Sequence, residues 1–368
     1  MFKAEELFQN VTDKNHPDET VLTIIQGKGT LPREQAGRNI HYDDASLSNY
    51  KKVEQGDFII HLRSFEGGLE MANEAGIVSP AYTILRCKRP HSSLFYDAYF
   101  HTDEFINHNL SKSVEGIRDG RQISYEAFKW LGIPYCEPTE QEKISSLFSV
   151  LNERIAKQRD LVESLKKYKR GVNNQILSQI DNSYNCRLGS VCEIVGGGTP
   201  DTLHTEYWGN TVEWFTPSEI GKTKYVNNSV RKLSDIGLNS SSAKLLPIGT
   251  VLLTTRATLG EMSIAKRECS TNQGFQSLIP HTDRVSSEYL YYMQIIIKPW
   301  CEKYASGNTF REISKSALSD CIIPIPDRTR QNQIVKLLSS IDMLIGAEES
   351  ILMSLSKIRH ALMQQLFI

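Results

Sequence analysis

The chain has 368 residues, 40% of them hydrophobic, and a formal net charge of −1 at pH 7. This length predicts two or three domains, and the near-zero charge argues against a protein that coats nucleic acid through a generally basic surface. No segment is long and apolar enough to cross a membrane, so we expect a cytoplasmic protein.

Residues 1–137 predict a first domain of mixed α/β structure. Short runs rich in β-branched and aromatic residues, bounded by turn-forming residues, predict strands over 21–25, 57–62 and 81–85. A longer segment with helical periodicity predicts a helix over 96–110.

Residues 138–182 predict one long helix. Ile144, Phe148, Leu151 and Ile155 begin a series of apolar residues that recur every three or four positions, as on one face of a helix. The series continues for about 40 residues, which corresponds to about 60 Å at 1.5 Å per residue.

Residues 183–326 predict a second domain of the same kind, followed by a second long helix over 327–368. The strands and the shorter helix of this domain are predicted over 212–216, 250–255, 275–279 and 286–300. Asp327 precedes the first periodic residue of the long helix and is a typical capping residue.

An internal repeat relates the two halves of the chain. Residues 121–178 align without a gap onto 311–368 at an offset of 190, so that Gln141, for example, recurs as Gln331. Upstream the likeness is weaker, at an offset of 193, and places Arg63 opposite Arg256. The chain therefore consists of two copies of one module, each with a varied domain and a more similar helix.

The two long helices must each cover an apolar face. One interpretation is a coiled coil between two copies of the chain. Because both helices belong to one chain, we favour an intramolecular antiparallel coiled coil with pseudo-twofold symmetry. Gln158 and Glu348 occupy one position of the repeat that is otherwise apolar, near the middle of the helices. We predict that these two side chains approach each other and fix the register.

Catalytic and metal-binding motifs are absent from the sequence. The run Gly196-Gly197-Gly198-Thr199-Pro200 lacks a following Gly-Lys-Ser/Thr and predicts a turn instead of a phosphate-binding loop. Neither an Asn-Pro-Pro-aromatic methyltransferase motif nor the Glu-x-Lys or Asp-x-Lys of a nuclease occurs. The histidines and the seven cysteines lack metal-ligand spacing, which predicts free thiols and no metal site.

The order of motifs in the second module resembles the specificity subunit of type I restriction–modification systems. The resemblance is carried by Arg187-Leu188-Gly189, 195–200, 255–260, 272–275 and 323–326. The first module looks like a divergent version that keeps Gly56-Asp57-Phe58 and Ile133-Pro134 but lacks the Gly-Gly-Gly-Thr-Pro opening.

This resemblance implies an α+β fold in which two target-recognition domains are joined by the helical pair. Each domain would read one half of a bipartite site in double-stranded DNA. The helices would set the spacing and dock a pair of adenine-methylating modification subunits, and a restriction/translocase subunit would complete the complex. S-adenosylmethionine, ATP and magnesium would belong to these partners, and the chain itself would need no cofactor.

Arg63 and Arg256, each at the end of an apolar strand, are the first candidates for DNA contact, because a guanidinium can bind guanine or a phosphate. The alternative for each is a salt bridge to a nearby carboxylate. Further candidates are polar or basic residues in neighbouring loops: Ser64, Arg118, Arg121, Thr258, Asn308, Thr309 and Arg311, with Lys28, Arg33, Arg38, Lys222 and Lys224 as a basic rim.

Two other functions remain open at this point. The chain could be a self-contained DNA-modification enzyme with a divergent catalytic motif, in which case it would bind S-adenosylmethionine alone. It could also be a coiled-coil scaffold with no role on DNA, in which case it would show no salt-dependent DNA binding.

Overall fold

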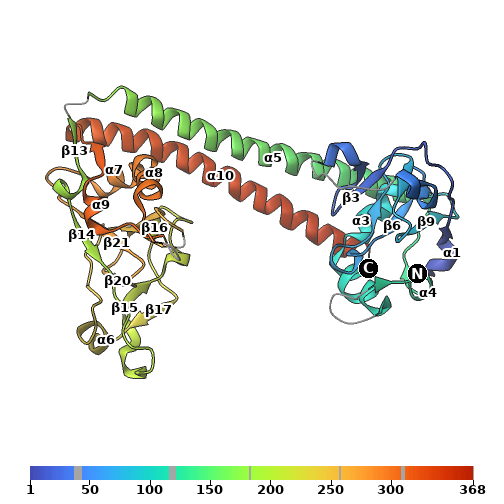
Figure 1. The fold of residues 1–368 in the computed structure, drawn as a ribbon, viewed down its shortest axis with the longest axis horizontal. Coiled ribbons are helices and arrows are strands. Elements are labelled where there is room, and N and C mark those ends of the chain that lie inside the picture. The colour runs from blue at the N-terminus through green and yellow to red at the C-terminus, as the bar shows by residue number, and fades with distance from the viewer. Residues whose placement is uncertain (37–43, 116–121, 182–183, 257, 308–310, 368) are drawn as a thin grey trace. The chain divides into compact units, whose positions relative to one another are not determined.

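The computed structural model describes residues 1–36, 44–115, 122–181, 184–256, 258–307 and 311–367 (Figure 1). The chain divides into two compact units. Unit 1 contains Met1–Asp160 and Glu349–Ile368, and unit 2 contains Leu161–Glu348. The boundary between the units cuts through both long helices, so each unit holds a globular part and one end of each helix. No helix in the described ranges is long and apolar enough to span a bilayer.

The centre of unit 1 is a four-stranded antiparallel sheet in the order β2-β9-β6-β7. Its strands are β2 (Phe8–Val11), β9 (Thr83–Cys87), β6 (Phe58–Ile60) and β7 (Glu70–Met71). Phe8 and Phe58 point from the sheet against Tyr96 and Phe100 of α3 (Ser93–Phe100), with ring centroids 4.9–6.4 Å apart. This aromatic cluster forms the core of the domain.

Short strand pairs and single-turn helices surround this sheet. The pairs are β1 (Phe2–Lys3) with β12 (Gly132–Ile133), β3 (Leu22–Ile25) with β4 (Gly29–Pro32), β5 (Lys51–Val53) with β8 (Gly76–Val78), and β10 (Val114–Glu115) with β11 (Gln122–Ile123). The single-turn helices are α1 (Ala4–Leu7), α2 (Ser64–Gly67) and α4 (Tyr125–Phe128).

The predicted helix over 96–110 is wrong in its extent. Helix α3 ends at Phe100, and a separate π-helical segment spans Glu104–Asn109. Thr102 accounts for the break, since its hydroxyl donates to the carbonyl of Tyr99 at 2.7 Å and accepts from the amide of Phe105 at 3.0 Å. A side chain that bonds the backbone in this way competes with helix continuation.

Unit 2 contains a five-stranded sheet in the order β14-β21-β18-β19-β16. The strands are β14 (Cys192–Gly196), β21 (Gln276–Pro280), β18 (Val251–Leu253), β19 (Met262–Ala265) and β16 (Tyr225–Val226), and only the β16–β19 pair is parallel. A three-stranded sheet has the order β17-β15-β20, with β17 (Arg231–Leu233), β15 (Trp208–Phe215) and β20 (Cys269–Thr271). In addition, β13 (Asn185–Arg187) pairs with β22 (Ile322–Pro324).

Three helices of unit 2 share a core cluster with the five-stranded sheet, namely α7 (Ser287–Tyr292), α8 (Gln294–Tyr304) and the shorter α9 (Lys315–Ser319). The short helix α6 (Asp235–Asn239) packs against the three-stranded sheet at β15 and β17. The single helix predicted over 286–300 is therefore interrupted at Met293, whose amide bonds to the carbonyls of both Tyr289 and Leu290 in a tightened turn. Tyr289 and Val251 share the largest core cluster with Leu338 of the second long helix.

The two long helices are α5 (Pro138–Ser178, 41 residues) and α10 (Arg328–Leu366, 39 residues), green and red in Figure 1. Both helices were predicted from their apolar periodicity and are confirmed. Asp327 caps α10 as expected, since its Oδ1 accepts a hydrogen bond from the amide of Arg330 at 2.9 Å. The four-part division of the chain at 137, 182 and 326 stays a prediction.

Contacts between α5 and α10 repeat in the two units. In unit 1, Arg359 Nε donates to Asn152 Oδ1 at 2.7 Å, and in unit 2, Lys169 Nζ lies 2.5 Å from Asp342 Oδ1. The offset of 190 carries Asn152 onto Asp342 and Lys169 onto Arg359. Equivalent positions of the two modules therefore build the same cross-helix contact in each unit.

Candidate nucleic-acid interface

Arg256 lies directly after the strand β18 and its continuation through Thr255. Its Nε is 2.9 Å from Glu312 Oε2, and the Thr255 hydroxyl donates to Glu312 Oε1 at 3.2 Å. The Arg256 side chain is still 41% exposed. Because a guanidinium carries five N–H donors, one carboxylate leaves donors that can face a nucleic acid. Contact of Arg256 with DNA stays a prediction, and the salt bridge that we considered as its alternative is present.

Arg63 lies at the start of α2 and is the more exposed of the two arginines. Its Nε is 3.4 Å from Glu66 Oε2, and its side chain is 71% exposed. The next residue, Ser64, is fully buried, and its hydroxyl accepts a hydrogen bond from the amide of His61 at 2.9 Å. The packing of Ser64 does not favour a direct contact with DNA, whereas Arg63 is free to reach a ligand.

Lys224 has a structural environment that the sequence did not reveal. Its Nζ lies 3.1 Å from both Tyr292 Oη and Ser339 Oγ, and 4.4 Å from the centre of the Tyr292 ring. Burial lowers the pKa of this amine. Tyr292 in turn donates to Asp342, the partner of Lys169. Lys224 therefore joins the end of the loop before β16 to α7 and α10, and it is not part of an open basic rim.

The remaining predicted residues have varied surroundings. Lys28 is exposed in the turn between β3 and β4, and Lys222 is exposed before β16. Arg33 is half-buried, with its guanidinium 6.0 Å from the centre of the Tyr50 ring. Thr258 is exposed, and the Arg311 guanidinium donates to the carbonyl of Glu302. Five predicted residues lie outside the described ranges, namely Arg38, Arg118, Arg121, Asn308 and Thr309.

The Gly-Gly-Gly-Thr-Pro run is an irregular segment packed against neighbouring backbone. A Cβ at Gly198 would lie 2.4 Å from the amide nitrogen of Ala243, which leaves room only for glycine. The carbonyl of Gly198 accepts from Trp214 Nε1 at 3.0 Å. These close approaches explain the glycines without a bound phosphate. The prediction of a turn is wrong, because Gly196 ends β14 and residues 197–200 continue as an irregular segment.

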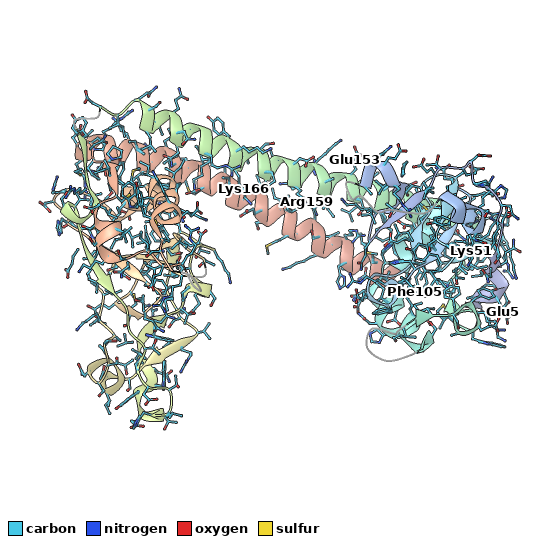
Figure 2. The ribbon with its side chains drawn as sticks, in the orientation of Figure 1. Glu5, Lys51, Phe105, Glu153, Arg159 and Lys166 are labelled. Atoms are coloured by element: carbon cyan, nitrogen blue, oxygen red, sulfur yellow. The ribbon has the colours of Figure 1, made fainter. Side chains whose placement is uncertain are left out.

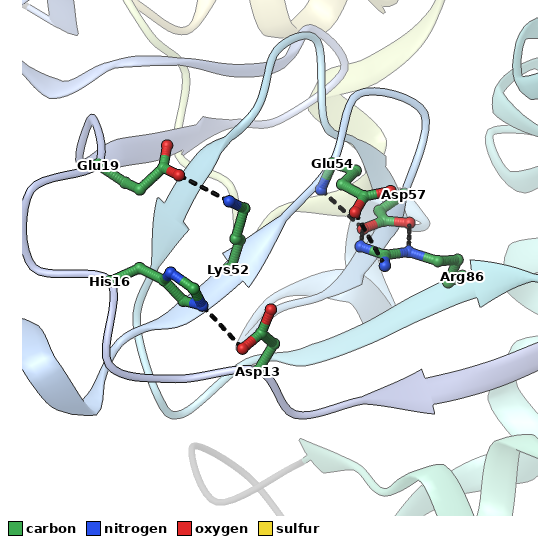
Figure 3. A network of polar contacts seen from close by, with 7 residues as sticks. All are labelled: Asp13, His16, Glu19, Lys52, Glu54, Asp57 and Arg86. Atoms are coloured by element: carbon green, nitrogen blue, oxygen red, sulfur yellow. Dashed lines mark hydrogen bonds and ion pairs between the residues drawn. The ribbon is translucent and has the colours of Figure 1, made fainter.

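A polar network in unit 1 uses several other charged residues (Figure 3). Arg86 binds the buried Asp57 in a bidentate pair, with Nε–Oδ1 and Nη2–Oδ2 distances of 2.9 and 2.7 Å, and its Nη1 lies 3.2 Å from Glu54. The hydrogen bonds that Arg86 donates to Asp57 raise the pKa of Arg86. Lys52 pairs with Glu19 at 2.7 Å. Arg86 and Lys52 are thus engaged inside the fold, which assigns Asp57 of the Gly56-Asp57-Phe58 motif a structural role.

The described residues contain no group of three or more His, Cys, Asp or Glu side chains arranged to hold a metal ion. Arg63 in unit 1 and Arg256 in unit 2, each with its own loop, can offer hydrogen bonds and positive charge to a ligand. These are the interactions that recognise nucleic acids.

Comparison with known proteins bears on the second module. Residues 180–357 match the family model of the type I restriction modification DNA specificity domain. This match covers slightly less than half of the chain. The recognition of the family from 187–189, 195–200 and the later motifs is confirmed.

Two curated relatives of the specificity domain extend this finding. The chain is 35% identical over 186 residues to the type I restriction enzyme MjaIX specificity subunit of Methanocaldococcus jannaschii, covering 50% of this chain and 43% of that protein. It is 25% identical over 260 residues to the EcoR124I/EcoR124II specificity subunit of Escherichia coli, covering 66% of this chain and 63% of that protein. The chain thus matches less than two thirds of the length of either relative.

Solved structures share the fold over nearly the whole chain. One, from a study of complex assembly and conformational transition of the type I R-M system, has a TM-score of 0.62 at 20% identity, covering 99% of this chain and 96% of that one. The type I S subunit from M. genitalium has a TM-score of 0.56 at 14% identity, covering 100% and 95%. These likenesses establish an α+β fold with long helices, as predicted.

One feature of unit 2 was not predicted from the sequence. A groove of about 670 Å³ in unit 2 is lined by Lys166, Lys169 and Arg170 of α5, together with Lys222 and Lys298; Figure 2 labels Lys166 on its helix. The helical periodicity of α5 drew attention to its apolar face. The basic residues on the other face gave no signal of their own, because a charged helix face is usually just solvated.

Proposed function

We propose that the chain is the DNA-specificity subunit of a type I restriction–modification complex. Its two domains each read one half of a bipartite site in double-stranded DNA. The observation that carries this proposal is the duplicated module, in which helix contacts are kept in both copies while the loops around Arg63 and Arg256 differ. Two different DNA-reading domains joined to equivalent helices suit a DNA target that has two parts.

The chain would act without a catalytic centre of its own. S-adenosylmethionine, ATP and magnesium would be bound by partner subunits that methylate, translocate and cleave. Because the substrate is cellular DNA, we place the complex in the cytoplasm.

The two long helices would form an intramolecular antiparallel coiled coil that sets the distance between the half-sites. The equivalent pairs Asn152–Arg359 and Lys169–Asp342 support the antiparallel direction. Gln158 is buried although it is polar, as expected for a register-setting position, and Glu348 is partly buried. The approach of Gln158 to Glu348 stays a prediction.

An exposed apolar stripe on the helices supports docking of two equal partners. On α10, Leu337, Leu344, Ile351 and Ile358 recur at intervals of seven and are 42–51% exposed. The repeat carries three of these positions onto Leu147, Leu161 and Tyr168 of α5, which are 43–60% exposed. A heptad stripe is suited to pack against a partner helix, and two equivalent stripes would take two copies of one modification subunit.

A DNA selection tests the reading function. The chain bound to its modification subunits is used to select duplexes from a random-sequence pool. We expect two separate blocks of fixed bases with a gap of constant length and free sequence between them. Enrichment of one block only, or of no sequence, would contradict the proposal.

The docking surface is tested with the double variant Leu344→Asp, Ile351→Asp. We expect light scattering of the purified complex to report one modification subunit in place of two, since a carboxylate in an apolar helix interface is costly. Met343→Asp is the matched control, because Met343 is 70% exposed and lies off the stripe. Equal loss in the control, or no loss in the double variant, would exclude this surface.

A further inference from the structure

The groove of unit 2 has a lining dominated by positive charge. It lies between α5, α8 and the loop before β16, and has a volume of about 670 Å³. Five cations and three carboxylates line it, so positive charge exceeds negative charge by two. The carboxylates are Glu261, Glu302 and Asp342.

Two of the cations are neutralised inside the groove. Lys298 Nζ and Lys169 Nζ each lie 2.5 Å from a carboxylate oxygen, of Glu261 and Asp342 respectively. Within the part of the chain that the structure describes, Arg170 and Lys222 form no ion pair, and both side chains are exposed. The groove thus presents a guanidinium from the helix and an ammonium from the domain to an incoming anion.

The groove is continuous with a loop that we assign to DNA reading. Gln294 Nε2 of α8 donates to the carbonyl of Gly260 at 3.0 Å and to Glu261 Oε2 at 3.1 Å. Gly260 has a positive φ of 77°, and a Cβ there would lie 2.9 Å from Lys298 Cγ. These contacts hold the loop that begins at Arg256 and carries Thr258 against the rim of the groove. A DNA strand that contacts this loop would therefore place its phosphates beside the groove.

We infer that this groove binds the phosphodiester backbone of DNA through Arg170 and Lys222. The inference rests on the proposed function and goes beyond it, because it makes a helix that was expected to act as a spacer into part of the DNA-binding surface. A single inorganic phosphate would occupy only a small part of such a volume, whereas a polyanion with phosphates at regular intervals can meet cations on both walls. Guanidinium and ammonium groups at these places position the duplex without reading its bases.

Unit 1 has a different lining at the corresponding place. A cavity of about 350 Å³ is lined by Asp97, His101, Asn152 and Arg359 among others. The offset of 190 places Ser356 and His360 where α5 carries Lys166 and Arg170. The backbone contact would therefore be made by one module only, so that one half-site is held more tightly to the scaffold than the other.

Fluorescence anisotropy of the full-length chain with a labelled duplex, measured over a range of salt concentrations, tests the inference. For the double variant Arg170→Gln, Lys222→Gln we expect a severalfold loss of affinity that is the same for target and unrelated DNA. The slope of log K against log salt should become less steep by about 0.9 for each phosphate contact that is lost. Methylation by the assembled complex should keep its sequence specificity.

Two matched controls accompany the double variant. Lys167→Gln removes one charge from an exposed position of α5 that does not line the groove, and His360→Gln changes the repeat equivalent of Arg170. Both should keep the wild-type salt slope. If the double variant has the same affinity and salt slope as these controls while the wild-type chain binds its target, the inference about the groove is wrong and the proposed function is unaffected. Loss of affinity for target DNA only would mean base contact and would also overturn it. Absence of any DNA binding by the wild-type chain would remove the proposed function as well.

Discussion

Gln331 accepts a hydrogen bond from the backbone amide of Ser286, with 3.2 Å between Oε1 and the amide nitrogen. The same relationship recurs in unit 1, where Gln141 Oε1 accepts from the amide of Ser92 at 2.9 Å. Both glutamines are buried in the first turn of a long helix, and both serines directly precede a helix of the domain, α7 or α3. The repeat thus preserves a polar anchor that fixes each long helix to its own domain.

We predict that Gln331→Leu destabilises unit 2 by about 1–3 kcal/mol. The Gln331 amide also donates to the carbonyls of Arg284 and Pro326 at 2.8 and 2.9 Å, and leucine would leave these groups unsatisfied. Urea unfolding followed by tryptophan fluorescence measures the change, since Trp208, Trp214 and Trp300 all lie in unit 2. Gln333→Leu, at an exposed position of the same helix, should cost less than about 0.5 kcal/mol. Equal effects of the two substitutions would refute the anchor.

The stability of the turn between β3 and β4 should depend on pH, because His101 is a titratable partner of Glu70. Glu70 is fully buried and accepts from the amides of Gly27 and Gly29 at 2.6 and 2.9 Å, and His101 Nε2 lies 3.4 Å from Glu70 Oε1. Burial alone would lower the pKa of His101, but its hydrogen bond to Glu70 and the charge of Asp97 outweigh burial and raise it. Burial alone would raise the pKa of Glu70, but its hydrogen bonds with His101, Gly27 and Gly29 lower it.

The direction of the pH dependence follows from these shifts. A raised histidine pKa stabilises the fold fully below the ordinary value of 6.5, and this contribution is lost as the pH rises through the higher folded value. The lowered pKa of Glu70 stabilises the fold fully above the ordinary value of 4.5, and this contribution is lost as the pH falls through the lower folded value. We expect hydrogen–deuterium exchange of 22–32, corrected for the intrinsic rate, to be slowest between these values. His101→Gln should remove the rise in exchange above the upper value, and His108→Gln should leave it unchanged. A wild-type protein whose protection stays constant through this range would refute the prediction.

We expect Arg63 and Arg256 to contact different half-sites of the DNA target. We predict that Arg256→Ala weakens recognition of one half-site by about 1–3 kcal/mol and leaves the other intact, with Arg63→Ala acting on the other half, as for bidentate base contacts. Binding to duplexes with base changes in each half measures this. Glu312→Gln is the control, because it breaks the salt bridge and keeps the arginine. Equal losses on DNA of any sequence would assign the arginines to phosphate, and absence of an effect would leave them structural.

Local patterns predicted the long helices well but not the surroundings of single polar residues. The starts of α5 and α10 are set by Pro138 and Asp327 and by apolar periodicity, all of which are visible in the sequence. The burial of Lys224 depends on Tyr292 and Ser339, which lie 68 and 115 residues away along the chain. No local pattern reports such a contact.

Several residues of the candidate site also depend on contacts between distant parts of the chain. Gln141 and Gln331 were visible as a repeated residue, but only the tertiary contacts reveal that they anchor the helices. The groove beside Arg170 combines residues of α5, α8 and the loop before β16, and no periodicity connects them. Ser64 was selected for its place next to Arg63, whereas its hydroxyl serves the start of α2.

Mapping of methylated adenines in host DNA tests the central claim most directly. Cells without the chain, with the wild-type chain, and with four residues inserted into α5 after Gln175 are compared by single-molecule sequencing. The insertion lengthens the helix by about 6 Å at 1.5 Å per residue, close to two base pairs of B-DNA at about 3.4 Å each. The account predicts a bipartite methylated sequence that is absent without the chain and that, after the insertion, keeps both half-sites with a spacer longer by about one or two base pairs. Methylation that persists at the same sites without the chain, or at the original spacing after the insertion, would contradict it.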